Sequence, residues 1–144
     1  MNSKSLSDYY YNHSFMDGLR KKLTELLPNT YCIAAIDIEH FRLFNKLYGR
    51  SSGDEVIRYI CACLKQSAME NDGIDAYLGG DNFVALLPDR DELLCGIREK
   101  IIKKLGKWNN TSAFFPLFGV YTIEDTSIQP ELMYDRAMLA RSHA

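Results

Sequence analysis

The stretch YLGGDNFVALLP, residues 77–88, contains a turn between two apolar segments. Tyr, Phe, Val and Leu on both sides favour β-strands, while the glycines, the aspartate and the asparagine between them are typical of tight turns. The preceding residues GIDA (73–76) extend the first strand. The stretch therefore predicts a β-hairpin whose turn presents Gly79, Gly80 and Asp81 at one edge of a sheet.

Two further strands flank this hairpin in the sequence. Residues 31–38, YCIAAIDI, are an almost unbroken apolar run, which predicts a buried central strand. Residues 114–123 predict a last strand, with Pro116 at its start or on a sheet edge. Helical spacing of apolar residues predicts helices over 15–27, 41–49, 51–69, 91–108 and 129–144.

This order of elements contains a β-α-β-β-α-β unit with one additional helix in its first crossover. That order predicts an α/β (α+β) fold of the ferredoxin-like kind, a mostly antiparallel sheet with the helices packed on one face. Three local signals mark helix ends: Gly49 as a C-cap, Ser52 as an N-cap with Glu55 completing a capping box, and Pro130 in the first turn of the last helix.

Length and composition narrow the class of protein. The 144 residues fit a single domain, 1–144, and the net charge of −2 with a pI of about 5.9 argues against a nucleic-acid binder. No apolar run reaches the ~18 residues of a membrane span, and the N-terminus lacks a signal peptide, so we expect a cytoplasmic protein without membrane contact. The chain stops inside a helical pattern, and we therefore expect a domain excised from a longer multidomain protein.

Two acids are expected to meet at one edge of the sheet. Asp37 ends the central strand and Asp81 lies in the hairpin turn. Two nearby carboxylates repel unless a cation joins them, and Mg²⁺ binds one or two protein carboxylates together with substrate phosphates. The alternative is a turn sequence and a solvated acid at a strand end, with no ligand.

A second polar pair flanks the junction of two predicted helices. Asn45 and Asp54 lie on either side of Gly49 and Gly53. An amide and a carboxylate complement the acceptors and donors of guanine, and such groups discriminate strongly when buried. Alternatively, both residues only cap helix ends.

Taken together, DIEHFRLFNKLYGRSSGDEVI (37–57) and YLGGDNFVALL (77–87) resemble the GGDEF family, the diguanylate cyclases and their degenerate relatives. The spacings of eight residues from Asp37 to Asn45 and nine from Asn45 to Asp54 are those of the family. The resemblance covers about residues 12–142. It implies the palm-type fold also seen in adenylyl cyclases, and active members condense two GTP into cyclic di-GMP as a face-to-face homodimer.

The resemblance also implies roles for individual residues. Asp37, Asp81 and the backbone carbonyl of Ile38 would hold Mg²⁺ or Mn²⁺, and Asn45 and Asp54 would bind guanine. Backbone amides from Ile38 to Phe41 would cradle phosphates. Gly79 and Gly80 would let the hairpin approach the substrate.

The chain departs from the family pattern at the catalytic signature. Asp81 is retained, but Asn82 replaces the following Glu, and an amide cannot accept a proton. Tyr77 replaces an Arg, and Ser142 replaces a Lys of the last helix, although Arg141 beside it offers another cation.

Three functions follow from this degenerate signature. The first is a regulatory module in cyclic di-GMP signalling that binds GTP or a related nucleotide with Mg²⁺ and has little or no cyclase activity. The second is an active diguanylate cyclase, and the third is a dimerisation scaffold that binds no nucleotide. In the family such domains often precede a phosphodiesterase of the EAL type, so a C-terminal EAL domain is a further expected partner.

Overall fold

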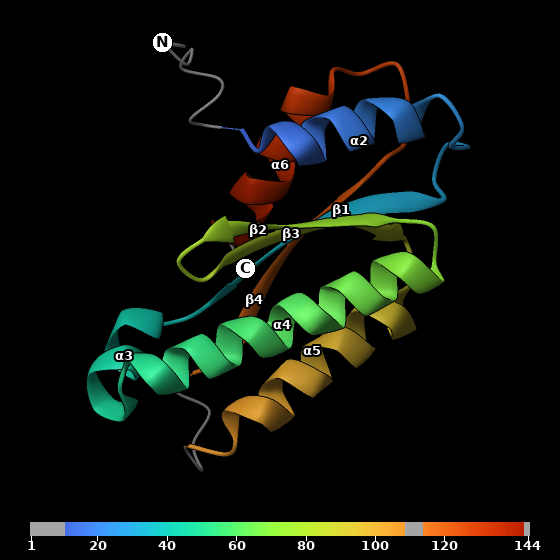
Figure 1. Cartoon of the computed structure of the whole chain (residues 1–144). Coiled ribbons are helices and arrows are strands. Elements are labelled where there is room, and N and C mark those ends of the chain that lie inside the picture. Colours follow the sequence, from blue (N-terminus) through green and yellow to red (C-terminus); the bar gives the residue numbers. More distant parts are fainter. Residues whose placement is uncertain (1–10, 109–113, 143–144) are drawn as a thin grey trace, which may run out of the picture.

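The computed structural model describes residues 11–108 and 114–142. Within these residues, five helices and four strands form three layers (Figure 1). The elements follow one another as α2 (His13–Leu23), β1 (Tyr31–Ile38), α3 (Phe41–Tyr48), α4 (Arg50–Glu70), β2 (Ile74–Gly79), β3 (Asn82–Pro88), α5 (Asp91–Leu105), β4 (Pro116–Thr122) and α6 (Pro130–Ser142).

The four strands are ordered β2-β3-β1-β4, and every pair of neighbours is antiparallel. This is the ferredoxin-like order. The first strand, β1, lies inside the sheet between β3, the second strand of the hairpin, and β4, the last strand. The predicted fold class is confirmed, and the predicted hairpin forms between β2 and β3. The helices α3 and α4 together make the crossover from β1 to β2.

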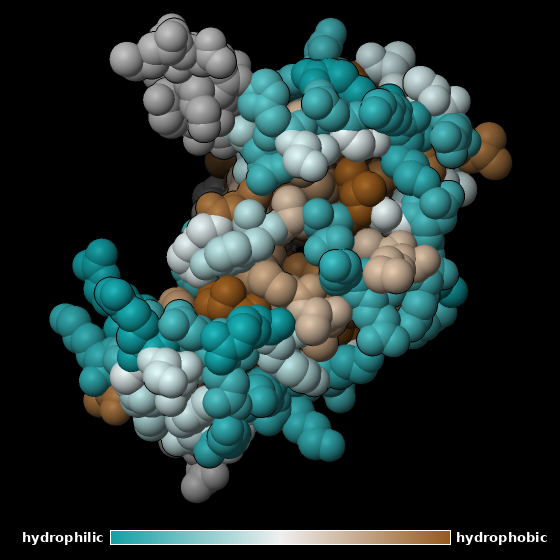
Figure 2. Space-filling view, in the orientation of Figure 1, coloured by the Kyte–Doolittle hydropathy of each residue, from teal (hydrophilic) through white to brown (hydrophobic). Residues whose placement is uncertain are grey.

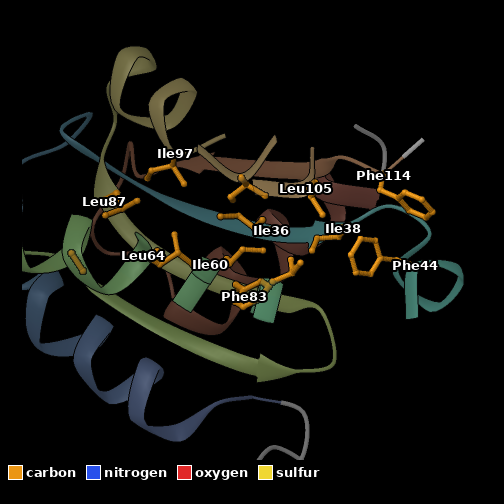
Figure 3. Close-up of a cluster of buried hydrophobic side chains, with 14 residues drawn as sticks. Ile36, Ile38, Phe44, Ile60, Leu64, Phe83, Leu87, Ile97, Leu105 and Phe114 are labelled. Atoms are coloured by element: carbon orange, nitrogen blue, oxygen red, sulfur yellow. The ribbon is translucent and has the colours of Figure 1, made fainter. Parts of the chain in front are cut away.

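Side chains of β1 and β3 alternate between two apolar cores, one on each face of the sheet. Ile36, Ile38 and Phe83 pack with α3, α4 and α5 on one face (Figure 3). Ile33 and Val84 pack with α2 and α6 on the other face. The prediction that helices cover a single face is therefore wrong, because strands that are apolar on both sides must be covered on both sides.

Most predicted helix ends lie within a few residues of the observed ones, with one clear error. Gly49, at φ +90°, ends α3 as predicted and directly precedes α4, which begins at Arg50. Ser52 is consequently inside the first turn of α4 and is not its N-cap. Pro116 begins the edge strand β4 and Pro130 begins α6, as expected.

Predicted and observed lengths also differ at the other helices. Helix α2 ends at Leu23, four residues before the predicted end, and α5 ends at Leu105. Residues 143–144 of the last predicted helix lie outside the described residues. Among the helices of the described chain, none has both the length and the apolar character that a membrane span requires.

Candidate functional site

The antiparallel pairing of β1 with β3 brings Asp37 and Asp81 to the same end of the sheet. The register pairs Ile36 with Phe83, so the end of β1 meets the turn that precedes β3. The backbone nitrogen of Ile38 donates a hydrogen bond to Asp81 Oδ2 at 3.0 Å. Two acids that are distant in sequence are thus held beside one another, as the sequence predicted.

The Asp37 carboxylate is in an unfavourable electrostatic environment. Its Oδ1 atom is buried and has no hydrogen-bond partner among the described residues. Burial raises the pKa of Asp37, the charges of Asp81 and Glu39 add to this, and the Arg141 guanidinium opposes it. Additional positive charge beside Asp37 would stabilise its ionised form.

A divalent cation fits the chemistry of this pair. Carboxylate oxygens from Asp37 and Asp81, with the carbonyl of Ile38, are ligands that Mg²⁺ and Mn²⁺ accept. Across residues 11–108 and 114–142, no group of three or more His, Cys, Asp or Glu side chains is placed to hold a metal. An ion here would therefore complete its coordination with water or phosphate oxygens.

The hairpin turn depends on its two glycines. Gly79 and Gly80 have φ values of +94° and +57°, which residues with a Cβ rarely adopt. Strand pairing slips between Tyr77 and Gly79, so a bulge re-aims the chain just before the turn. The backbone of the turn thus requires the two glycines locally, apart from any ligand.

The last helix, α6, brings the positively charged side chain of Arg141 into the site, and no sequence motif predicted this contact. Arg141 Nη1 donates a hydrogen bond to Asn82 Oδ1 at 2.9 Å, and Arg141 Nε lies 3.5 Å from Asp37 Oδ2. Asn82 is therefore a hydrogen-bond acceptor for Arg141.

The predicted guanine-binding pair lies at the junction of α3 and α4. Asn45 Oδ1 is buried without a hydrogen-bond partner among the described residues, and it lies directly over Gly53, where a Cβ would stand 1.9 Å from it. Asp54 follows Gly53 and is exposed. Asn45 therefore contacts the residue that directly precedes Asp54 in the first turn of α4.

The loop that was expected to cradle phosphates is partly occupied. The amide of Ile38 donates to Asp81, and the amide of Glu39 donates to the carbonyl of Phe115 at 3.0 Å. Within the described chain, the structure records no partner for the amides of His40 and Phe41. Closing the sheet edge thus engages the first two amides of this loop.

Two aromatic side chains border this region. The ring of Phe41 is partly buried at the margin of the core and stacks on Phe44. Burial raises the pKa of Tyr77, and the charges of Cys61, Asp54 and Asp81 raise it further. Tyr77 is therefore within electrostatic reach of both the guanine-binding pair and the carboxylate pair.

Comparison with known proteins shows the family to which this chain is related. The family model "Diguanylate cyclase, GGDEF domain" matches residues 9–131. A probable diguanylate cyclase of Escherichia coli K12, DgcT, is 23% identical over 137 residues, which is 90% of this chain and 30% of that protein. Diguanylate cyclase DgcM of the same strain is 40% identical over 62 residues, 43% of this chain and 15% of that protein.

Solved structures share the fold. The GGDEF domain of DgcB from Caulobacter crescentus, crystallised with c-di-GMP, has a TM-score of 0.68 at 23% identity and covers 90% of this chain and 79% of its own. A sensory box/GGDEF family protein from Caulobacter crescentus CB15 has a TM-score of 0.70 at 21% identity, covering 92% and 90%.

The present chain spans less than a third of the length of the curated relatives described above. The family match nevertheless covers most of the chain and includes both polar pairs and the hairpin. The chain belongs to the GGDEF domain family of diguanylate cyclases.

Proposed function

We propose that this domain binds a guanine nucleotide together with Mg²⁺ or Mn²⁺ and acts as a regulatory module in cyclic di-GMP signalling, with little or no cyclase activity. The observation that carries the proposal is the hydrogen bond from Arg141 to Asn82. The position of the signature Glu holds a neutral amide that is already engaged, while the remaining polar pairs of the site are retained.

Base recognition is assigned to Asn45 and Asp54. A buried acceptor without a partner costs about 1–3 kcal/mol, so the Asn45 Oδ1 atom gains when a ligand N–H reaches it. The exposed Asp54 carboxylate accepts from the N1–H and the exocyclic amine of guanine. Adenine, which offers no N1–H donor, leaves Asp54 unsatisfied.

Phosphate and cation binding are assigned to the hairpin end of the sheet. Asp37, Asp81 and the Ile38 carbonyl would hold the divalent ion, which would neutralise phosphate charge when bound. Gly79 and Gly80 would let the phosphates approach the hairpin backbone closely. The amides of His40 and Phe41, at the start of α3, would donate to phosphate oxygens.

Weak or absent catalysis follows from Asn82. An amide neither accepts a proton nor carries negative charge, and loss of a positioned acid–base group costs about 10²–10⁴ in rate. A domain that retains the two polar pairs and lacks this group would bind nucleotide and transmit its presence to an attached domain or partner.

Calorimetric titration of the domain with GTP in the presence of Mg²⁺ tests the binding. We expect saturable heat for the wild type, with affinity at least tenfold lower for Asp54→Asn. Glu99→Gln removes an exposed charge from α5, outside the site, and should bind like the wild type. Absence of heat at millimolar GTP would reject the proposal and leave the dimerisation scaffold.

An active cyclase is the second candidate, favoured by the retention of Asp37, Asn45, Asp54 and Asp81. It would require a face-to-face homodimer. Chromatography of GTP incubated with a forced dimer would detect cyclic di-GMP, and Asn82→Glu should raise the rate if only that position is impaired. An attached EAL domain stays a prediction.

A further inference from the structure

Arg141 makes contacts with two separate residues of the site. Its guanidinium lies 3.5 Å from the Asp37 carboxylate and donates to Asn82 at 2.9 Å. Only 17% of the Arg141 side chain and 26% of the Asp37 side chain are exposed. The pair is therefore shielded from water on most sides. The positive charge of Arg141 lies close enough to repel a cation bound to Asp37.

Packing of the backbone, rather than the arginine alone, brings the guanidinium there. A Cβ at Gly119 of β4 would stand 2.1 Å from the backbone nitrogen of Arg141, so α6 approaches β4 with no space between the two backbones. Helix α6 is thereby fixed on the sheet one residue from its described end. The Arg141 side chain has a short path to Asp37 and Asn82.

The neutral amide of Asn82 does not compensate the charge of Arg141. A carboxylate at position 82 would form its own ion pair with the guanidinium, whereas the amide oxygen only accepts a hydrogen bond. Among the described residues, the acid that pairs with Arg141 is Asp37. At 3.5 Å this ion pair is long enough to be exchanged when another group offers the guanidinium better geometry.

We propose that Arg141 competes with the divalent cation for Asp37, so that the nucleotide-free domain binds such cations only weakly. The inference rests on the proposed function in assigning a cation to Asp37 and Asp81, and it adds the residue that controls access to them. A phosphate group, which pairs bidentately with a guanidinium, would draw Arg141 from Asp37 and open the carboxylate.

The competition is tested by titrating the full chain with Mn²⁺ alone and following the free ion by electron paramagnetic resonance. We expect Arg141→Met, which keeps a long side chain without charge, to bind Mn²⁺ at least tenfold more tightly than the wild type. Arg136→Met is the matched control, because Arg136 is on the same helix and contacts Tyr121 rather than the site. Equal affinities in all three proteins would overturn the inference.

Further variants test whether a gain in Mn²⁺ affinity arises from the contact between Arg141 and Asp37. Asp37→Asn in the Arg141→Met background should abolish the gain, and persistence of the gain would overturn the inference. If Arg141→Met does not fold, Arg141→Gln serves instead, with circular dichroism to confirm the fold. Arg141→Lys should stay close to the wild type.

The nucleotide titration separates this inference from the proposed function. Heat with GTP but no change in Mn²⁺ affinity on removing Arg141 would reject the competition alone. Tighter Mn²⁺ binding without any heat from GTP would reject the nucleotide-binding function and leave the competition in place.

Discussion

Gly119 of β4 lies directly against the backbone of Arg141 in α6. A Cβ at position 119 would stand 2.1 Å from the Arg141 nitrogen and 2.3 Å from the Ala137 carbonyl oxygen, and neither of these backbone atoms can rotate away. This contact sets the distance between the last helix and the edge strand. It also determines how far into the site Arg141 reaches.

Gly119→Ala should therefore destabilise the domain by about 1–3 kcal/mol, because the added methyl must push two backbones apart. Gly96→Ala is the matched control, since a Cβ at position 96 of α5 has nothing within 4 Å. It should stabilise by about 0.5–1 kcal/mol through helix propensity. Urea unfolding measures both, and equal stabilities would contradict the close packing.

Gly53→Ala should displace the side chain of Asn45 with a smaller loss of stability. The added Cβ would stand 1.9 Å from Asn45 Oδ1, which is a side-chain atom and can rotate. We expect a large shift of the Asn45 side-chain amide signals in a ¹⁵N–¹H NMR spectrum and at least a tenfold loss of GTP affinity. Unchanged amide signals would show that Asn45 does not lie over position 53.

Glu55 should titrate well below an ordinary glutamate. Hydrogen bonds from Lys107 at 2.7 Å and from Lys104, whose Nζ lies 2.9 Å away, lower the pKa of Glu55 to about 2 from 4.5. The stabilisation is fully present above pH 4.5 and is lost as the pH falls through about 2. Carbon-13 NMR of the Glu55 carboxyl measures the midpoint.

Lys107→Met should move that midpoint upward, because the largest contribution comes from Lys107. Since the cluster is at the surface, a higher salt concentration should also raise the midpoint, because salt screens the attraction of the lysines for Glu55. A wild-type midpoint near 4.5 would contradict the two lysine contacts.

The cysteines should differ widely in reactivity. Cys32 is buried in β1, and burial, with the nearby charge of Asp89, raises the pKa of its thiol to about 12. Cys95 is exposed on α5. Iodoacetamide at pH 8 should modify Cys95 rapidly and leave Cys32 unmodified until the protein is unfolded, as peptide mass spectrometry would detect.

Surface composition is consistent with these local clusters. Figure 2 shows hydrophilic side chains over both helical layers, with apolar surface gathered between the layers. On the face that this view shows, the hydrophilic surface therefore lies mainly over the helices.

Much of the fold could be predicted because its signals are local. The hairpin follows from Gly79 and Gly80, which alone permit its positive φ values, and the buried strand follows from the apolar run at 31–38. The meeting of Asp37 and Asp81 follows from the ferredoxin-like order once the strands are known. The N-cap at Ser52 failed because Gly49 ends one helix and immediately precedes the next.

By itself, the sequence determined the strands, the hairpin, the family and the positions of the polar pairs, since these depend on neighbouring residues and fixed spacings. The tertiary structure decided that helices cover both faces of the sheet and that Arg141 reaches Asp37 and Asn82. It also decided that Asn45 Oδ1 is buried over Gly53, with no hydrogen-bond partner in the part of the chain that the structure describes. These features depend on the packing distance between segments far apart in the chain. No local pattern specifies that distance, because it is set by which side chains, or which absent Cβ atoms, lie between the backbones.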